Sequence, residues 1–436
     1  MAEAVEKISD IERRVKVMVP IASFQSEITQ RLQQLVKTAR VQGFRPGKVP
    51  LKIVEQQYGG DVRGEVYTKA IESKFGEIVQ KNNLRVAGMP DIQHEPLGKV
   101  NSDFQFTATF EIFPEFKLAD IKKQKLTQYE TAITAADVKK TIDVIVKQRA
   151  VYAKVDRAAK MDDKVMALMQ SAIDGKVAES SGTEPIEFVL GDVNRVKGFD
   201  SALVGLKGGE TKGFTIKYPK THEPKELAGK DVEYVVMIKE VQEPSLPKID
   251  EDFAKSLGVA DGDLKKMNEE IKQSLEQEVE RRIKANLKQQ VFTSLVESHT
   301  FDLPKALVGA EINRLGQTTY QNLQKQGMDS KDIRLEPAMF EENAKIACKL
   351  RIILGSIVDT HTLQANPDQI KAKVEEFSSN YDDSAQAIKW FYEDEKRLDE
   401  PRSLATEDNV VSWFTDQCKK DSKKIELDLV LAGQFN

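Results

Sequence analysis

A single narrow stripe of apolar residues runs through the last third of the chain with helical spacing. Its members recur every three or four residues, and mostly polar or charged residues occupy the other positions. The stripe consists of Leu264, Met267, Ile271, Leu275, Val279, Ile283, Leu287, Val291 and Leu295. A helix with such a narrow apolar stripe buries little of its surface against its neighbour. The helices from Asp250 onward can therefore pack as an elongated bundle with apolar patches left open. An ordinary closed bundle is the alternative.

Prolines divide the remainder of this region. We expect further helices after Pro304, near Pro337, near Pro367 and after Pro401. The alternating residues Ile425, Leu427 and Leu429 predict a short closing strand.

The first part of the chain has the mixed pattern of an α+β domain. Apolar residues alternate with polar ones in two stretches, which predicts strands, and recur at helical spacing in two others. In chain order these stretches are 15–19 (strand), 24–39 (helix), 51–78 (helix) and 104–112 (strand). The pair Gly59-Gly60 predicts a break in the second helix.

The middle of the chain differs from both ends. Residues 165–241 consist of short apolar runs separated by glycines and prolines, which is typical of a compact β-rich domain. Before them, Thr134 and Asp137 predict a capping box that opens a helix. After them, the segment 243–247 (EPSLP) predicts a domain boundary.

The length of 436 residues corresponds to about three domains. We therefore expect a multi-domain α+β protein with an N-terminal α+β domain, an inserted β-rich domain and an elongated all-α C-terminal domain. The expected divisions are 1–113, 114–155, 156–243 and 244–436.

Charge and cysteine content restrict the class of protein. The chain is 31% charged with a net charge of -5, yet residues 1–59 carry ten Lys or Arg against six Asp or Glu. This basic excess is either a contact for an anionic partner such as nucleic acid or ordinary scatter. Two cysteines without CxxC spacing suit a reducing compartment. With no apolar run long enough for a membrane and no export signal at the start, we expect a cytoplasmic protein that does not bind membranes.

Residue patterns for metal or nucleotide chemistry are missing from the sequence. The four histidines, His94, His222, His299 and His361, are isolated from one another and from cysteines. Neither a phosphate-binding GxxxxGK[ST] nor a GxGxxG after a strand occurs. We therefore expect no metal and no cofactor.

The most informative string is GFRPGKVP at 43–50, between the two predicted N-terminal helices. Two glycines and two prolines make a stiff loop, which holds out one aromatic ring and two cations. An exposed Phe beside Arg and Lys suits a mixed surface of protein and phosphate. The alternative is a buried Phe44 with cations that are merely solvated.

This string resembles the ribosome-binding signature of the bacterial trigger factor family. The segment 83–90 (NLRVAGMP) and the order of the domains are also similar to that family, so the resemblance spans nearly the whole chain. It implies contacts with the large ribosomal subunit beside the peptide exit tunnel, through a ribosomal protein and neighbouring RNA. The residues implied in these contacts are Gly43, Phe44, Arg45, Pro46, Gly47 and Lys48.

The resemblance also gives each division a role. It implies that 1–113 binds the ribosome, that 114–155 is a linker and the first part of a chaperone domain, and that 244–436 is the helical remainder of that domain. Residues 156–243 resemble an FKBP-type prolyl isomerase domain in three segments. These are 188–191 (FVLG), 195–199 (RVKGF) and 206–210 (LKGGE).

An isomerase of this kind needs no nucleophile. A dry aromatic cradle favours the twisted imide, and a few hydrogen bonds hold the peptide. By the resemblance, Val196, Phe199 and Tyr234 line the cradle. Ile186 and His222 lie at its rim, and Glu179 stands for the acid near the substrate carbonyl.

Several positions depart from the family pattern. Leu168, Met169 and Ser171 are atypical for the first strand of the isomerase domain, Ala178 replaces an aromatic residue, and Thr221 replaces a tyrosine. Alanine and threonine cannot replace stacked rings. We therefore expect a retained fold with weakened isomerase activity.

The resemblance thus implies an ATP-independent chaperone that shields nascent and unfolded polypeptides, assists folding and export, and takes part in protein transport and cell division. A homodimer off the ribosome is an open alternative to a monomer. Two other hypotheses are a free-standing prolyl isomerase with substrate-recruiting domains and an RNA-binding regulator. The substitutions in the predicted cradle argue against the free-standing isomerase. The lack of aromatic strand motifs or a basic helix argues against the RNA-binding regulator.

Overall fold

The computed structural model groups the chain into two compact units, residues 1–128 with 284–423 and residues 129–283 with 424–436. The residues that the structure describes are 4–20, 24–45, 47–94, 104–173, 176–177, 184–191, 195–219, 227–328, 333–379, 381 and 383–435.

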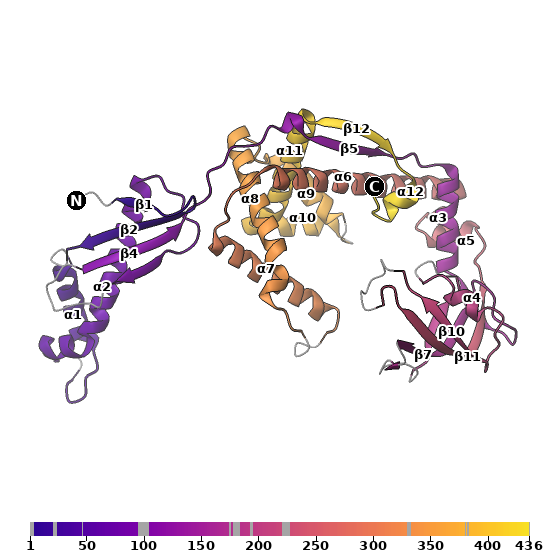
Figure 1. Ribbon diagram of the computed structural model, residues 1–436, viewed down its shortest axis with the longest axis horizontal. Coiled ribbons are helices and arrows are strands. Elements are labelled where there is room, and N and C mark those ends of the chain that lie inside the picture. The colour runs from indigo at the N-terminus through magenta and orange to yellow at the C-terminus, as the bar shows by residue number, and fades with distance from the viewer. Residues whose placement is uncertain are drawn as a thin grey trace. The chain divides into compact units, whose positions relative to one another are not determined.

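The first unit opens with a four-stranded antiparallel sheet in the order β1-β2-β4-β3 (Figure 1). Its strands are β1 (Val5–Lys7), β2 (Glu12–Val19), β3 (Asp91–His94) and β4 (Phe104–Glu111). The predicted alternation is confirmed, because Val15, Val17 and Val19 of β2 are buried with Phe106 and Phe110 of β4.

Two helices follow β2, namely α1 (Gln25–Thr38) and α2 (Leu51–Lys81). The second half of α2 packs against the sheet, and its first half packs against α1. The break predicted at Gly59-Gly60 is wrong, since α2 is continuous. Apolar residues at helical spacing continue across the two glycines through Val54, Val62 and Val66, and their burial outweighs the low helix propensity of glycine.

The helical part of the first unit surrounds an apolar core. Its members are Ile121, Leu126, Val291, Leu295, Ile353, Ile357, Val410 and Phe414. The helices after residue 300 are α7 (Lys305–Lys325), η3 (Pro337–Phe340), α8 (Glu341–His361), α9 (Pro367–Ser378), α10 (Ser384–Tyr392), η4 (Glu395–Leu398) and α11 (Asp399–Gln417). The short helix η2 (Ile121–Lys123) precedes them in the chain.

The apolar stripe found in the sequence forms one helix, α6 (Leu264–Ser298). Met267 and Leu275 are buried in a core of the second unit, whereas Val291 and Leu295 belong to the core of the first. The prediction of one long helix with a narrow buried side is confirmed.

The closing strand predicted at 425–429 is wrong. The strand is instead the lysine-rich run β12 (Lys419–Lys424), which pairs with β5 (Lys125–Glu130), and α12 (Leu427–Leu431) follows it. Leu427 and Val430 are both buried, and residues three apart share one face of a helical turn. This three-residue spacing, rather than the alternation, decides the local structure.

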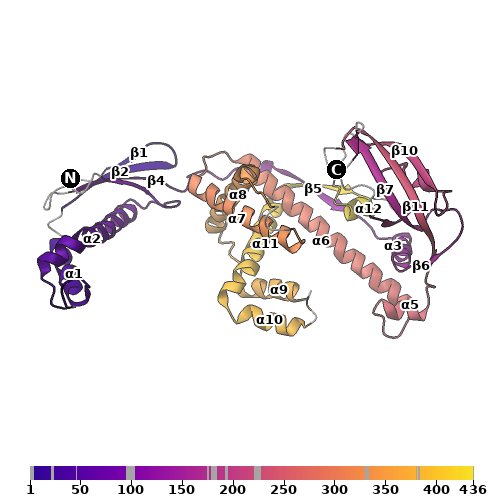
Figure 2. The same ribbon diagram turned by 90° about the horizontal axis from the view of Figure 1, so that it is seen from below.

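The second unit contains a six-stranded sheet. Its main order is β10-β11-β7-β8, while β6 pairs with β11 and β9 pairs with β7. The strands are β6 (Val151–Lys154), β7 (Lys164–Ile173), β8 (Lys176–Val177), β9 (Ile186–Val189), β10 (Thr211–Lys217) and β11 (Asp231–Ser245). Figure 2 shows β7, β10 and β11 as one sheet. The predicted boundary segment 243–247 begins inside β11, which continues to pair with β6.

Besides α12 and the first part of α6, the second unit contains three helices: α3 (Ala135–Gln148), α4 (Phe199–Leu203) and α5 (Glu251–Ser256). The predicted capping box of α3 is confirmed. The Asp137 amide donates to Thr134 Oγ1 at 3.3 Å, and the Thr134 amide donates to Asp137 Oδ2 at 2.8 Å.

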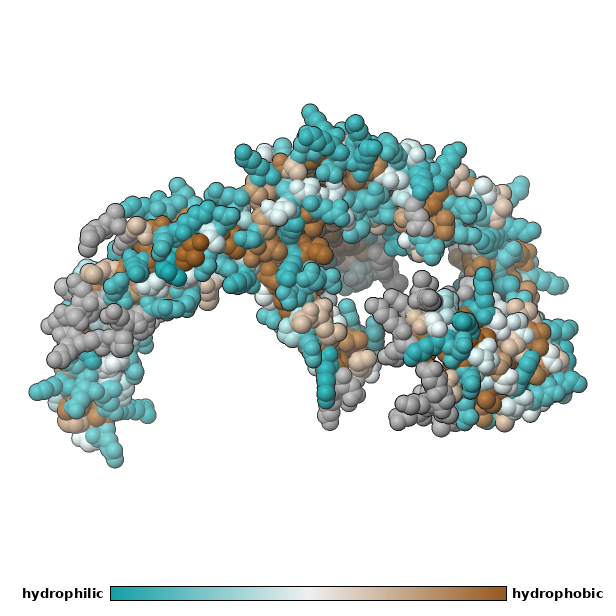
Figure 3. Space-filling model, viewed as in Figure 1, coloured by the Kyte–Doolittle hydropathy of each residue, from teal (hydrophilic) through white to brown (hydrophobic). Residues whose placement is uncertain are grey.

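The face of the molecule seen in Figure 3 is largely hydrophilic, with small apolar patches between the charged residues. None of the helices in the described part of the chain combines the length and the hydropathy that a membrane span requires.

Candidate functional sites

The loop between α1 and α2 is anchored at both ends. Ala39 and Val49 are buried in the core shared by the two helices. Between them, the Phe44 amide donates to Val41 O at 3.1 Å, and the Lys48 amide donates to Arg45 O at 3.0 Å. Two consecutive turns therefore fix the path of the loop.

Two glycines give this loop its shape. Gly43 has a φ of +89° and Gly47 a φ of +80°, in the left-handed region that other L-residues rarely adopt. The residue between Arg45 and Gly47, Pro46, is one of the predicted docking residues and lies outside the described residues.

The tip of the loop is exposed, as the sequence predicts. The Phe44 residue has 42% of its surface exposed, and Arg45 and Lys48 are also exposed. Within the described residues, neither cation forms an ion pair with a carboxylate. By contrast, Arg31 on α1 pairs with Glu27 at 3.0 Å. The loop therefore exposes one apolar ring and two cations on the surface of its domain.

The second candidate site is an aromatic cluster in the second unit. The ring of Tyr234 on β11 meets the ring of Phe199 edge-on at 5.2 Å between centroids and stacks with Phe214 of β10 at 5.7 Å. Phe199 also contacts Phe214 at 5.4 Å and Phe188 of β9 at 5.9 Å. Val196 is partly buried against the same core.

The start of α4 sets the position of Phe199. Gly198, at a φ of +100°, reverses the chain just before it, and a Cβ there would lie 3.3 Å from Ile216 Cδ1. The Asp200 carboxylate accepts from Arg195 Nε at 2.8 Å and from the Gly191 amide at 2.9 Å. These bonds connect the loop after β9 to the helix.

The atypical residues of β7 divide between its two faces. In the register of β7 with β11, Ser171 lies opposite Tyr234 and Met169 lies opposite Val236. Met169 packs against the core beside the cluster. Leu168 alternates with them and therefore points to the opposite face. A small hydroxyl side chain thus stands beside the Tyr234 ring, where the resemblance predicts a different residue.

The remaining predicted site residues are only partly placed. Ile186 lies on β9 opposite Ala167 of β7, and it is exposed. Glu179 and His222 lie outside the described residues, as do the substituted positions Ala178 and Thr221. The structure therefore brings together Val196, Phe199 and Tyr234.

Sequence reasoning missed two members of the cluster. Phe214 contacts both Phe199 and Tyr234, and the Tyr218 hydroxyl lies 2.6 Å from the Tyr234 hydroxyl. The sequence contains a pattern that predicts their common face. Phe214, Ile216 and Tyr218 alternate with polar residues, as on one face of a strand.

Burial changes the acid-base behaviour of this phenol. Tyr234 is 8% exposed. Its burial raises the pKa of the hydroxyl above the ordinary value, and the hydrogen bond with Tyr218 adds to the rise. Tyr234 is therefore neutral at physiological pH.

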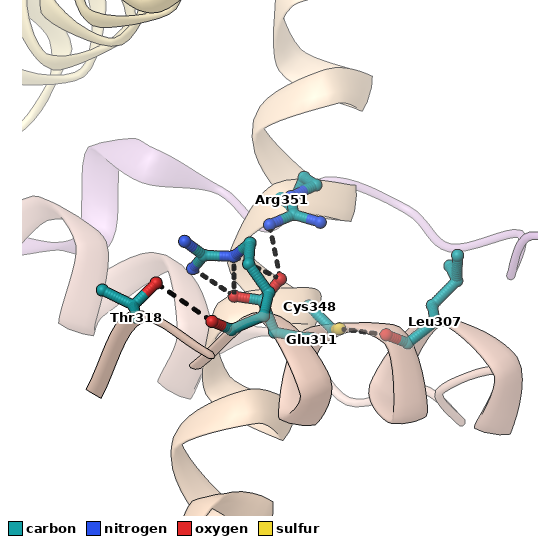
Figure 4. A network of polar contacts seen from close by, with 6 residues as sticks. Leu307, Glu311, Thr318, Cys348 and Arg351 are labelled. Atoms are coloured by element: carbon teal, nitrogen blue, oxygen red, sulfur yellow. Dashed lines mark hydrogen bonds and ion pairs between the residues drawn. The ribbon is translucent and has the colours of Figure 1, made fainter. Parts of the chain in front are cut away.

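A polar network joins α7 to α8 in the helical part of the first unit (Figure 4). Glu311 of α7 is 2% exposed, and its carboxylate accepts from Arg314 Nε at 3.1 Å and from Arg351 Nη2 of α8 at 2.8 Å. These hydrogen bonds, that of Arg314 first, lower the pKa of Glu311. Next to it, the buried thiol of Cys348 donates to Leu307 O at 3.3 Å.

The histidines and cysteines that the structure describes do not form a metal site. Among the described residues, no group of three or more His, Cys, Asp or Glu side chains is placed to hold an ion. His299 is a structural residue: its Nε2 accepts from the Ala119 amide at 3.0 Å, and its Nδ1 lies 2.7 Å from Leu295 O.

Comparison with known proteins gives the same order of domains. Residues 1–145 match the family described as bacterial trigger factor protein, and residues 263–416 match the C-terminus of that protein. Residues 155–239 match the FKBP-type peptidyl-prolyl cis-trans isomerase family.

Three related proteins, each named trigger factor, match over nearly their whole length. The protein of Methylobacillus flagellatus is 44% identical and is aligned over 98% of this chain and 99% of its own. That of Aromatoleum aromaticum is 38% identical over 97% of both chains, and that of Chromobacterium violaceum is 37% identical over 100% of both.

The fold and the matches define a chaperone that carries an FKBP-type prolyl isomerase domain between an N-terminal α+β domain and a helical region. The chain belongs to the bacterial trigger factor family. Because the match covers the whole chain, the hypotheses of a free-standing isomerase and of an RNA-binding regulator are not supported.

Proposed function

We propose that the chain docks on the large ribosomal subunit beside the exit tunnel through the loop 43–48 and shields nascent polypeptides there without ATP. The observation that carries this proposal is the exposed Phe44 ring beside the exposed Arg45 and Lys48, on a loop anchored by Ala39 and Val49. An exposed aromatic ring gains most when a partner crease buries it. The cations suit RNA phosphates or acidic side chains.

Clients would be held by scattered apolar contacts on the helical part. Several large apolar residues there are exposed, among them Met339 of η3, Ile346 of α8 and Trp390 of α10. A groove of about 560 Å³ also lies along α7 and η3. It is lined by Ile312, Gly316, Tyr320, Leu335, Pro337 and Phe340, among others. Shallow apolar sites of this kind accept many sequences and release them readily.

The isomerase domain would act weakly on X-Pro bonds of these clients. Phe199, Tyr234 and Val196 would enclose the imide, with Ile186 and His222 at the rim and Glu179 near the substrate carbonyl. The substitutions at Met169, Ala178 and Thr221 remove rings or a hydroxyl from such a cradle, so turnover should be below that of relatives that retain them.

Each division would then have its own role. Residues 1–113 would dock on the ribosome, and 114–155 would form the linker. Residues 156–243 would be the isomerase, and 244–436 would hold clients. We propose that the protein works in the cytoplasm, and that it is able to form a homodimer when it is off the ribosome.

Co-sedimentation with ribosomes tests the docking loop. The variant Phe44→Ala with Arg45→Ala should no longer sediment with the large subunit. A matched control is Lys16→Ala with Met18→Ala on β2, which removes an exposed cation and an exposed apolar side chain of the same domain.

The control variant should sediment like the unmodified protein. Binding that persists in the loop variant would exclude this loop as the docking site. Binding of the unmodified protein to ribosomal RNA stripped of protein would instead favour recognition of RNA alone.

A further inference from the structure

Two lysine-rich segments lie together where β12 pairs with β5 (Figure 1). They are residues 117–125 and 419–423, both in the first unit, and we call them the lysine ribbon. The Lys419 amide donates to Gln124 O at 3.1 Å, which joins the start of β12 to the residue before β5. The lysine ribbon contains seven lysines and two aspartates, in a chain with a net charge of -5. Positive charge is therefore concentrated at one place of an acidic protein.

Packing does not explain this composition. All six residues of β12 are exposed, whereas a strand in a larger sheet buries at least one of its faces. Lysine and aspartate also have a low β propensity. Edge strands often carry lysines that prevent pairing with other molecules, but Lys117, Lys122 and Lys123 precede β5 and lie outside both strands. These lysines therefore require another explanation.

Within the described residues, three lysines of the ribbon have no carboxylate partner. These are Lys125, Lys419 and Lys420, which are all exposed. By contrast, Lys345 of α8 pairs with Glu341 at 2.8 Å. The charge of the three lysines is therefore available to a partner.

The lysine ribbon is fixed to the helical part of the first unit. The Thr127 amide of β5 donates to Gln290 Oε1 of α6 at 2.9 Å, and Gln290 Nε2 donates to Thr127 O at 3.0 Å. Leu126 of β5 is buried in the same core as Val291 of α6. The ribbon is therefore a surface of the helical part and not a free arm that could enter a groove of a double helix.

The composition of β12 indicates the class of partner. Its ammonium groups attract carboxylates and phosphates. Its six residues include neither an apolar side chain that a membrane would bury nor an aromatic ring on which RNA bases would stack. An extended polypeptide fits better, because alternate side chains lie about 6.6 to 6.8 Å apart in any extended chain, including β12 itself. Carboxylates of an acidic segment can therefore follow the lysines of the ribbon.

The charge of the whole chain makes such a surface useful. A protein with a net charge of -5 repels acidic polypeptides at long range, and a positive surface attracts them. We propose that the lysine ribbon binds acidic segments of unfolded client polypeptides. It supplies charge attraction, whereas the exposed apolar residues of the helical part hold the apolar segments of clients. This inference rests on the proposed holding of clients by that part.

The test uses the full chain and two unstructured peptides that contain the same apolar residues. One peptide carries several glutamates, and the other carries glutamines at the same positions. Fluorescence anisotropy of each labelled peptide gives its Kd. The unmodified protein should bind the glutamate peptide about 3- to 10-fold more tightly at low salt, since each exposed ion pair contributes modestly. The difference should vanish at about 1 M salt, where the Debye length is about 3 Å.

A ribbon variant and a matched control assign this preference to the lysines. The ribbon variant combines Lys125→Gln, Lys419→Gln and Lys420→Gln, and it should bind both peptides equally. The control removes the same charge from lysines of α8 and α9 that pair with carboxylates, and it should keep the preference for the glutamate peptide. It combines Lys345→Gln, Lys371→Gln and Lys373→Gln.

Loss of the preference in the ribbon variant, with unchanged binding of the glutamine peptide, would support the proposal. A preference that persists in the ribbon variant, or that is lost equally in the control, would overturn it. Tighter binding of a short RNA duplex than of the glutamate peptide, lost in the ribbon variant, would also overturn it and identify RNA as the partner. Failure of the unmodified protein to bind either peptide would refute the holding of clients as well.

Discussion

Phe44 and Phe199 occupy similar local settings and have opposite surroundings. Each directly follows a glycine at positive φ, Gly43 at +89° and Gly198 at +100°. Phe44 is 42% exposed, whereas Phe199 is 7% exposed among the rings of Phe188, Phe214 and Tyr234. The same Gly-Phe sequence therefore places its ring at the surface in one domain and in the core in the other.

The difference in exposure predicts different effects when each ring is removed. Removing a ring that packs inside its own domain should lower stability, whereas removing an exposed ring should lower only the affinity for a partner. The comparison can therefore be tested by measuring both quantities on both sites.

The largest effect on stability is expected for Phe199→Ala. Loss of a buried ring costs about 3 to 5 kcal/mol, which is enough to loosen the isomerase domain. Both tryptophans of the chain, Trp390 and Trp413, lie in the helical part, so their fluorescence does not report on this domain. Hydrogen exchange of β10 and β11 peptides should increase strongly, and ribosome binding should be unchanged. Equal protection of the β11 amides from exchange in Phe199→Ala and in the unmodified protein would contradict this expectation.

A smaller loss of stability is expected when a buried charge, rather than a buried ring, is removed. Arg45 and Lys48 have no carboxylate partner in the described residues, whereas Glu311 is buried between Arg314 and Arg351. Glu311→Gln should destabilise the contact of α7 with α8 by about 1 to 2 kcal/mol, because both arginines are largely exposed and solvent screens the pairs. Denaturant unfolding followed by tryptophan fluorescence measures this loss.

The pH dependence of the same variant has a defined sign. The pKa of Glu311 is lowered from its ordinary value of 4.5, first by the hydrogen bond from Arg314. The contribution of the Glu311 carboxylate to folding stability is therefore complete above about pH 4.5. It is lost as the pH falls through the lower pKa that this group has in the folded protein. The stability difference between the two proteins should shrink over that interval. A difference that stays constant down to pH 3 would show that the carboxylate charge has no role.

The smallest effect concerns the shape of the docking loop. In Gly47→Ala the ring and the cations are retained, and the nearest atom to the new Cβ, Lys37 O, is 3.9 Å away, so the alanine fits. The φ of +80° still strains it by about 1 kcal/mol, which should weaken ribosome binding roughly 5-fold.

Gly60→Ala in α2 is the matched control, because that glycine is helical and its new Cβ meets no atom within 4 Å. It should stabilise the helix slightly and leave the affinity unchanged. An equal loss of affinity in both variants would mean that the loop conformation is not what binds.

Patterns of apolar residues predicted most elements of the fold. The alternation of Val15, Val17 and Val19, the capping box at Thr134 and the long stripe of α6 each correspond to an element in the structure. Two local predictions failed where tertiary burial overrides local propensity. These were the break at Gly59-Gly60, which lies within the continuous helix α2, and the strand at 425–429, where Leu427 and Val430 are buried on a helical turn.

The sites were predictable to different degrees. The proposed docking loop is contiguous in sequence, so one string of residues was enough to predict it, and the exposure of Phe44 was correctly expected. The aromatic cluster combines residues from β9, α4, β10 and β11, and only the register of the sheet brings Phe214 opposite Tyr234. The Tyr218–Tyr234 contact and the Glu311 network depend on side-chain directions that sequence spacing alone does not give.

The ribosome affinity of Phe44→Ala with Arg45→Ala, measured beside its suppression of aggregation in free solution, tests the central claim most directly. The account predicts a loss of affinity of about 30-fold or more, since buried hot-spot residues contribute at least 2 kcal/mol, with unchanged suppression of aggregation. Ribosome affinity equal to that of the unmodified protein would contradict it.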